Sequence, residues 1–170
     1  TLNMALSGVR DMSTMETPPE ERLPIKTYVS EDSDDLIREA ILRELDRGGQ
    51  VFYLHNRIHS IYAAADRIAR LAPQARIAVG HGRMDEEALA DVMSAFAKVE
   101  YDVLVCTTII ESGLDLPNVN TLIIDRADAL GLAQLYQLRG RVGRGRNRAY
   151  SYLLVPRGRR ITETAQKRWE

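Results

Sequence analysis

The feature that most restricts the fold of this chain is a recurring unit, a short apolar strand followed by an amphipathic helix. Strands are predicted over residues 25–29, 51–54, 76–79, 102–106, 119–124 and 150–155. Helices are predicted from a cap at Asp32 or Ser33 to Gly48, and over residues 58–71, 85–98 and about 132–138. Strands that alternate with helices of this length form a mainly parallel sheet covered on both faces. The predicted fold class is therefore α/β, a three-layer sandwich.

Length and composition are those of one folded domain. The chain has 170 residues, of which 45% are apolar and 28% are charged. It has no apolar run of the roughly 18–20 residues that would span a bilayer, and its first residues do not resemble a secretion signal. We therefore expect a cytoplasmic protein with no membrane partner. The single cysteine, Cys106, lies in an apolar strand, which favours a core position over a nucleophile.

Several loops after predicted strands carry polar groups. In open parallel sheets, ligands bind beyond the carboxyl ends of the strands. The loops here contain Asn56 with Arg57, Gly80-His81-Gly82, Thr107 with Thr108, and the segment around Asp125. The glycines beside His81 suggest backbone amides exposed to an anion, and the two threonine hydroxyls can hold phosphate oxygens.

The sequence predicts no metal site. Of the three histidines, only His55 and His59 have helical spacing, and no Glu-x-x-His motif or cysteine pair accompanies them. The acidic run from Asp85 to Glu87 resembles the magnesium-binding box of nucleoside triphosphatases, but it opens an amphipathic helix instead of following an apolar strand. Acidic residues in a first helical turn are ordinary caps and partners of the helix dipole.

The strongest local signal is a basic segment, residues 137–144, at the end of a predicted helix. Net charge is only −1, yet arginines crowd this part of the chain. Arg141 and Arg144 point the same way if the helical turn continues, so both could reach one polyphosphate. The alternative is a solvated basic loop that binds any polyanion. A dinucleotide fingerprint is disfavoured, because the glycine spacing is reversed.

Asp115 is a second candidate for nucleotide binding. It stands between apolar neighbours shortly after a predicted buried strand, where its carboxylate could accept a hydrogen bond from a ribose hydroxyl. The alternative is a turn-forming aspartate before Leu116-Pro117.

The chain lacks a phosphate-binding loop. That loop needs a lysine directly after a glycine, and Lys26, Lys98 and Lys167 never follow one. Without the loop and a magnesium carboxylate, the chain cannot hold the β- and γ-phosphates of ATP. We therefore expect ATP and Mg²⁺ to be held mainly by another domain, and the isolated chain to bind neither and to be inactive as an ATPase.

The order of four segments, residues 52–57, 80–82, 107–117 and 137–144, resembles motifs IV to VI of superfamily-2 helicases. These motifs are the signature of the second RecA-like motor domain. Within that superfamily, the chain is similar over nearly its whole length to the translocase module of the bacterial transcription-repair coupling factors. The stretches that carry this likeness include residues 8–13, 40–44, 125–128, 131–138 and 165–168. Branched-DNA helicases of the RecG type fit residues 10–13 and 125–128 less well.

The resemblance implies a role for each motif residue. Arg141 and Arg144 would be arginine fingers that complete an ATP site between two RecA-like domains, Gln137 would couple the nucleotide to that interface, and Gly113 and Asp115 would contact the nucleotide. The residues that would face the backbone of duplex DNA are Asn56, Arg57, His81, Gly82, Thr107 and Thr108.

The resemblance also implies a function and a domain organisation. Residues 1–24 would be an interdomain arm, residues 25–160 the motor domain, and residues 161–170 the start of a truncated translocation-motif helix. The whole protein would be an ATP-dependent double-stranded DNA translocase that displaces stalled RNA polymerase and couples transcription to nucleotide excision repair. It would meet the polymerase and the repair proteins through modules outside this chain. The alternatives are a RecG-like branched-DNA helicase domain and a stand-alone polyanion-binding module.

Overall fold

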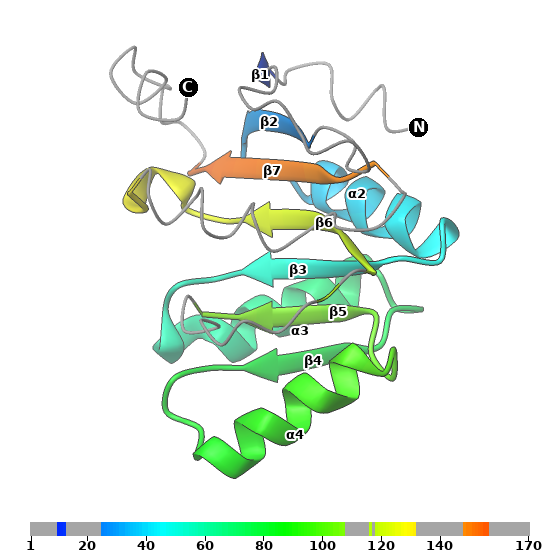
Figure 1. Cartoon of the computed structure of the whole chain (residues 1–170). Coiled ribbons are helices and arrows are strands. Elements are labelled where there is room, and N and C mark those ends of the chain that lie inside the picture. The colour runs from blue at the N-terminus through cyan, green and yellow to red at the C-terminus, as the bar shows by residue number, and fades with distance from the viewer. Residues whose placement is uncertain (1–9, 13–24, 108–115, 117, 132–147, 157–170) are drawn as a thin grey trace.

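The computed structural model describes residues 10–12, 25–107, 116, 118–131 and 148–156. Within these residues, seven strands form one sheet in the order β1-β2-β7-β6-β3-β5-β4 (Figure 1). The strands are β1 (Arg10–Met12), β2 (Lys26–Glu31), β3 (Gln50–Leu54), β4 (Ile77–Gly80), β5 (Val103–Cys106), β6 (Val119–Ile124) and β7 (Tyr150–Val155). Every neighbouring pair is parallel except β1 with β2. The predicted α/β class with a mainly parallel sheet is confirmed.

Helices cover both faces of the sheet. Helices α2 (Asp34–Asp46) and α3 (Ile61–Leu71) lie on one face, and α4 (Glu86–Ala97) lies on the other (Figure 1). Because successive strand residues point to opposite faces, β3 contributes to two separate cores. Val51 and Tyr53 pack with α2 and α3, whereas Phe52 and Leu54 pack on the side of α4. Burial on both faces explains why these strands read as continuous apolar runs.

Two predicted helix starts are confirmed in detail. The Ser33 side chain accepts a hydrogen bond from the backbone N–H of Leu36 at 3.3 Å, and Asp85 caps α4 by accepting from the N–H of Ala88 at 2.7 Å. The acidic run at residues 85–87 is therefore a cap and first turn, as the sequence indicated.

The helix predicted from residue 58 differs from the structure at its start. Residues Ile58–Ser60 form a short 3₁₀ turn, η2, and α3 begins only at Ile61. The Ser60 hydroxyl does not cap α3, because it is hydrogen-bonded to the ring of His55 at 2.7 Å. A tertiary contact thus replaces the local cap. The helix predicted over residues 132–138 lies outside the described residues.

A short antiparallel strand was not predicted. The sequence predicts an irregular arm here, yet the backbone of Arg10–Met12 pairs with β2, with Asp11 opposite Tyr28. Three residues are too few to show the alternation that identifies a strand. The pairing covers the edge of β2, which would otherwise present unpaired backbone groups.

Cys106 lies in the core, as predicted. It is the last residue of β5 and is buried, and this burial raises the pKa of its thiol to about 12. A thiol held protonated in apolar surroundings is a poor nucleophile.

No helix in the described ranges is long and apolar enough to cross a membrane.

Candidate nucleic-acid interface

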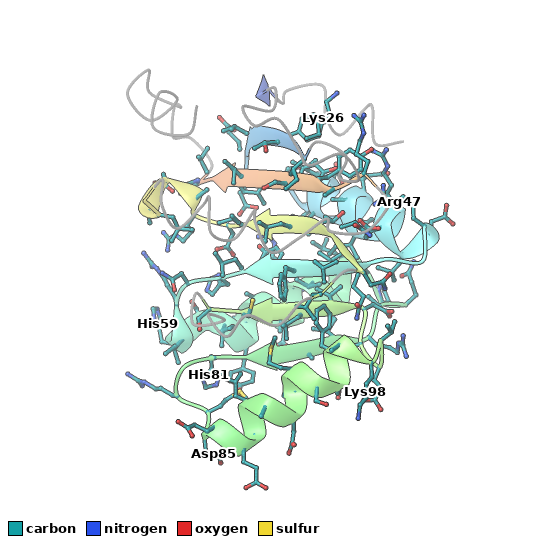
Figure 2. The ribbon with its side chains drawn as sticks, in the orientation of Figure 1. Lys26, Arg47, His59, His81, Asp85 and Lys98 are labelled. Carbon is teal, nitrogen blue, oxygen red and sulfur yellow. The ribbon has the colours of Figure 1, made fainter. Side chains whose placement is uncertain are left out.

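The candidate site lies at the carboxyl edge, the edge of the sheet at which β3, β4, β5 and β6 end. The loops that leave this edge begin at His55, His81, Thr107 and Asp125. Figure 2 shows His59, His81 and Asp85 at this side of the molecule, while Arg47 and Lys98 lie at the opposite side. Because parallel strands end together, residues far apart in sequence meet here.

A hydrogen-bonded group joins two of these loops. Nδ1 of His55 lies 2.7 Å from Oδ2 of Asp125, and its Nε2 lies 2.7 Å from Oγ of Ser60. Tyr53 donates its hydroxyl hydrogen to the same Asp125 oxygen at 3.0 Å. Since a carboxylate only accepts, Nδ1 of His55 carries a hydrogen and donates it to Asp125. This group fixes the η2 turn and the end of β6 relative to β3.

Tyr53 acts only as a donor in this group. Burial, followed by the negative charge of Asp125, raises the pKa of the Tyr53 hydroxyl well above its ordinary value. The hydroxyl therefore stays protonated and keeps its hydrogen bond. The sequence indicates the segment around Asp125 as part of a site, but no local pattern marks Tyr53 or Ser60.

His81 was predicted to face DNA, but its side chain is buried, with 8% exposed. Nδ1 accepts the backbone N–H of Arg83 at 3.2 Å, and Nε2 lies 3.1 Å from the Tyr62 hydroxyl. The ring therefore shapes the loop from within. Gly80 is also buried, and a Cβ there would lie 3.1 Å from Leu89 Cδ1. The expectation of an exposed backbone amide is therefore wrong for Gly80. Gly82 is exposed.

Thr107 occupies the first position after β5. Its N–H donates to the Gly80 carbonyl at 3.3 Å, and its side chain is only 4% exposed. In the part of the chain that the structure describes, its Oγ1 has no hydrogen-bond partner. A buried hydroxyl without a partner costs about 1–3 kcal/mol, so this position suits a group completed by a ligand or by another segment.

Exposed cations surround these groups. Arg57, Arg83 and Arg126 are all exposed, one each in the loops that follow β3, β4 and β6. Arg126 adopts a left-handed conformation with φ of 51°, which turns the chain sharply after Asp125. No sequence motif gives Arg83 or Arg126 a function. The signal that could have found them is their position just after strand ends. Asn56 is exposed beside Arg57.

The predicted nucleotide-binding residues lie outside the described residues, and their roles stay predictions. These residues are Gly113, Asp115, Gln137, Arg141 and Arg144, and the predicted DNA-facing residue Thr108 lies there too.

Comparison with known proteins decides the family. The profile of the helicase conserved C-terminal domain matches residues 32–146, which is most of the chain. The chain belongs to this family. This helicase C-terminal domain is also similar in sequence to part of several longer proteins. It is 57% identical over 170 residues to the transcription-repair-coupling factor of Escherichia coli, covering 100% of this chain and 15% of that protein.

Transcription-repair-coupling factors of other bacteria are similarly close in sequence. The domain is 56% identical over 168 residues to the transcription-repair-coupling factor of Haemophilus influenzae, covering 99% of this chain and 15% of that protein. The corresponding protein of Myxococcus xanthus is 54% identical over 170 residues, covering 100% of this chain and 14% of that protein. The domain thus spans only a small part of these relatives.

Solved structures give the same fold. RecG bound to a three-way DNA junction superposes with a TM-score of 0.74 and 37% identity, covering 90% of this chain and 20% of that one. Domain 2 of the DEAD-box helicase Mss116p bound to an RNA duplex superposes with a TM-score of 0.61 and 20% identity, covering 76% of this chain and 53% of that one. The predicted RecA-like sandwich is confirmed.

Proposed function

We propose that this helicase C-terminal domain is the second RecA-like motor domain of an ATP-dependent double-stranded DNA translocase. The translocase displaces stalled RNA polymerase and couples transcription to nucleotide excision repair. The observation that carries the proposal is the 57% identity to the transcription-repair-coupling factor of E. coli along 100% of the chain. The protein is expected to act in the cytoplasm, where bacterial DNA and RNA polymerase are found.

The proposed ATP site is shared between two domains. This chain has no glycine-lysine phosphate loop, so ATP and Mg²⁺ would be held mainly by a first RecA-like domain. Arg141 and Arg144 would approach the terminal phosphate from this side, with Gly113, Asp115 and Gln137 also at the nucleotide. An arginine finger accelerates phosphoryl transfer by a factor of about 10³–10⁵. The domain alone is therefore expected to be inactive as an ATPase.

The proposed DNA contacts lie at the carboxyl edge. Asn56, Arg57 and Gly82 are exposed there, which supports their assignment to the DNA backbone. His81 and Thr107 are buried, so His81 would position the loop, and Thr107 would need a small rearrangement to meet phosphate. Contacts of this kind hold DNA without reading its sequence, as a translocase requires.

The test is displacement of a stalled polymerase by the intact protein that carries this domain. A transcription complex halted by nucleotide omission is incubated with the protein and ATP, and release of the transcript is measured. Release that depends on ATP hydrolysis is expected. Absence of release, with a control complex confirmed to be releasable, would contradict the proposal.

A second candidate, a branched-DNA helicase, is favoured by the 37% identity to RecG bound to a three-way junction. The same protein would then remodel a three-way junction at concentrations that leave stalled polymerase in place. A third reading, a stand-alone polyanion-binding module, predicts binding to heparin and to duplex DNA alike without any ATP-dependent activity.

A further inference from the structure

Tyr62 combines exposure with a link to a buried group. It lies in the first turn of α3, and 58% of its surface is exposed, although it is a large aromatic residue. Its ring packs edge-on against the His81 ring, with centroids 5.7 Å apart and planes at 85°. Its hydroxyl oxygen lies 3.1 Å from Nε2 of His81.

The hydrogen positions in this contact follow from the neighbouring bond. The backbone N–H of Arg83 can only donate, so Nδ1 of His81 is the acceptor of that bond. A neutral imidazole with an accepting Nδ1 carries its hydrogen on Nε2. Nε2 therefore donates to the Tyr62 oxygen. The hydroxyl hydrogen of Tyr62 is not used in this bond and remains available to an external acceptor.

We propose that Tyr62 and Arg83 form a phosphate-binding subsite for the backbone of duplex DNA at the carboxyl edge. The inference rests on the proposed function and adds two contact residues to it. Tyr62 donates its hydroxyl hydrogen to a phosphate oxygen, and Arg83, which is exposed two residues beyond His81, supplies the positive charge. Tyrosine hydroxyls and arginines are both common donors to DNA phosphates.

The hydrogen-bond chain favours this role. It runs from the Arg83 N–H through His81 to Tyr62, with every donor oriented toward the exposed end. Hydrogen bonds aligned in one direction polarise one another, which makes the terminal hydroxyl a better donor. The acidic first turn of α4, which begins at Glu86 after the cap Asp85, would repel phosphates further along the loop. The subsite is thereby restricted to the Tyr62 side.

The test measures the affinity of the intact protein for a labelled duplex of mixed sequence at several salt concentrations. Tyr62→Phe keeps the ring and removes only the hydroxyl, so affinity should fall about three- to tenfold at each salt concentration. The slope of log affinity against log salt should not change, because no charge is lost. Arg83→Gln should reduce that slope by about 0.9, the value for one phosphate contact.

Arg70→Gln is the matched control. It removes one arginine from the last turn of the same helix, at the opposite end of α3, and should leave both affinity and slope unchanged. Thermal unfolding is recorded for each variant. A fall in affinity with an unchanged melting temperature supports the subsite, whereas a fall accompanied by a clearly lower melting temperature would assign Tyr62 a structural role and overturn it.

Two further outcomes separate this inference from the function on which it rests. If the unmodified protein binds duplex DNA and Tyr62→Phe binds equally well, the subsite is overturned and the proposed function stands. If the unmodified protein shows no measurable duplex binding, both are overturned.

Discussion

Oγ1 of Thr121 lies 2.6 Å from Oε1 of Glu44, so a strand in the middle of the sheet donates a hydrogen bond to a carboxylate on α2. Glu44 is only 1% exposed. Arg47 donates to both carboxylate oxygens of Glu44, at 3.0 and 3.1 Å, and also to the Arg148 carbonyl at 2.8 Å. The buried carboxylate therefore ties α2 to β6 and to the start of β7, at the edge opposite the candidate site.

Burial gives Glu44 a pH-dependent effect on stability. Loss of hydration is the largest cause, and it raises the pKa of Glu44 above its ordinary value of 4.5 despite the opposing bonds from Thr121 and Arg47. Between the unfolded and the folded pKa, the folded state binds more protons, so the contribution of Glu44 to stability decreases as pH rises through this window.

The substitution Glu44→Gln removes this titration. The stability of the unmodified domain relative to Glu44→Gln should be greatest at pH 4 and should decrease as pH rises toward 7. Urea unfolding of both proteins at several pH values measures the difference. A difference that grows with pH would contradict the raised pKa.

Gly49 has no room for a side chain because of the same carboxylate. A Cβ at this position would overlap Oε2 of Glu44, which Thr121 and Arg47 hold in place through its two oxygens. Gly49→Ala should therefore destabilise the domain by about 1–3 kcal/mol, the usual range for overpacking. Gly131→Ala is the control, since a Cβ there meets nothing within 4 Å. Its change in the free energy of unfolding should stay within about 0.5 kcal/mol.

Val99 offers a stabilising substitution. It follows α4 with φ of 62°, a left-handed conformation that is costly for a β-branched residue. The N–H groups of Val99 and Glu100 donate to the carbonyls of Phe96 and Ala95, the pattern that usually has glycine at this position. Since the Val99 side chain is 42% exposed, its removal sacrifices little packing. Val99→Gly should stabilise the domain by about 1 kcal/mol.

Gly48 supplies the matched comparison for Val99. It ends α2 with φ of 81° and the same pair of hydrogen bonds, from Gly48 to Leu45 and from Gly49 to Glu44. Gly48→Ala should destabilise the domain by about 1 kcal/mol. Thermal or urea unfolding measures the change in stability of each variant, which should be positive for Val99→Gly and negative for Gly48→Ala. A destabilised Val99→Gly variant would show that the Val99 contacts outweigh the backbone cost.

The arginine-finger assignment is tested in the intact protein. Arg144→Ala should lower DNA-stimulated ATP hydrolysis by a factor of about 10³ or more while ATP binding remains measurable. Arg148→Ala is the control, because Arg148 lies four residues beyond Arg144, outside the basic segment of residues 137–144, and is exposed. Equal losses in the two variants would favour a general polyanion-binding loop, and unchanged hydrolysis in Arg144→Ala would remove the finger role.

The amino-acid sequence alone determined strands β2 to β7 and helices α2 to α4, apart from their exact ends. The caps at Ser33 and Asp85 and the apolar periodicities act through residues within about four positions, so they can be read without knowledge of the fold. The alternation of strands and helices also predicted the parallel sheet and its covered faces.

Tertiary structure decided which of the polar residues meet. His55 and Asp125 are 70 positions apart, and they come together only because β3 and β6 are neighbours in the sheet and end at the same edge. The contact between Tyr62 and His81 depends in the same way on where α3 begins relative to the end of β4. Such contacts depend on strand order and helix placement, which are set by packing over the whole domain, and no local pattern encodes them.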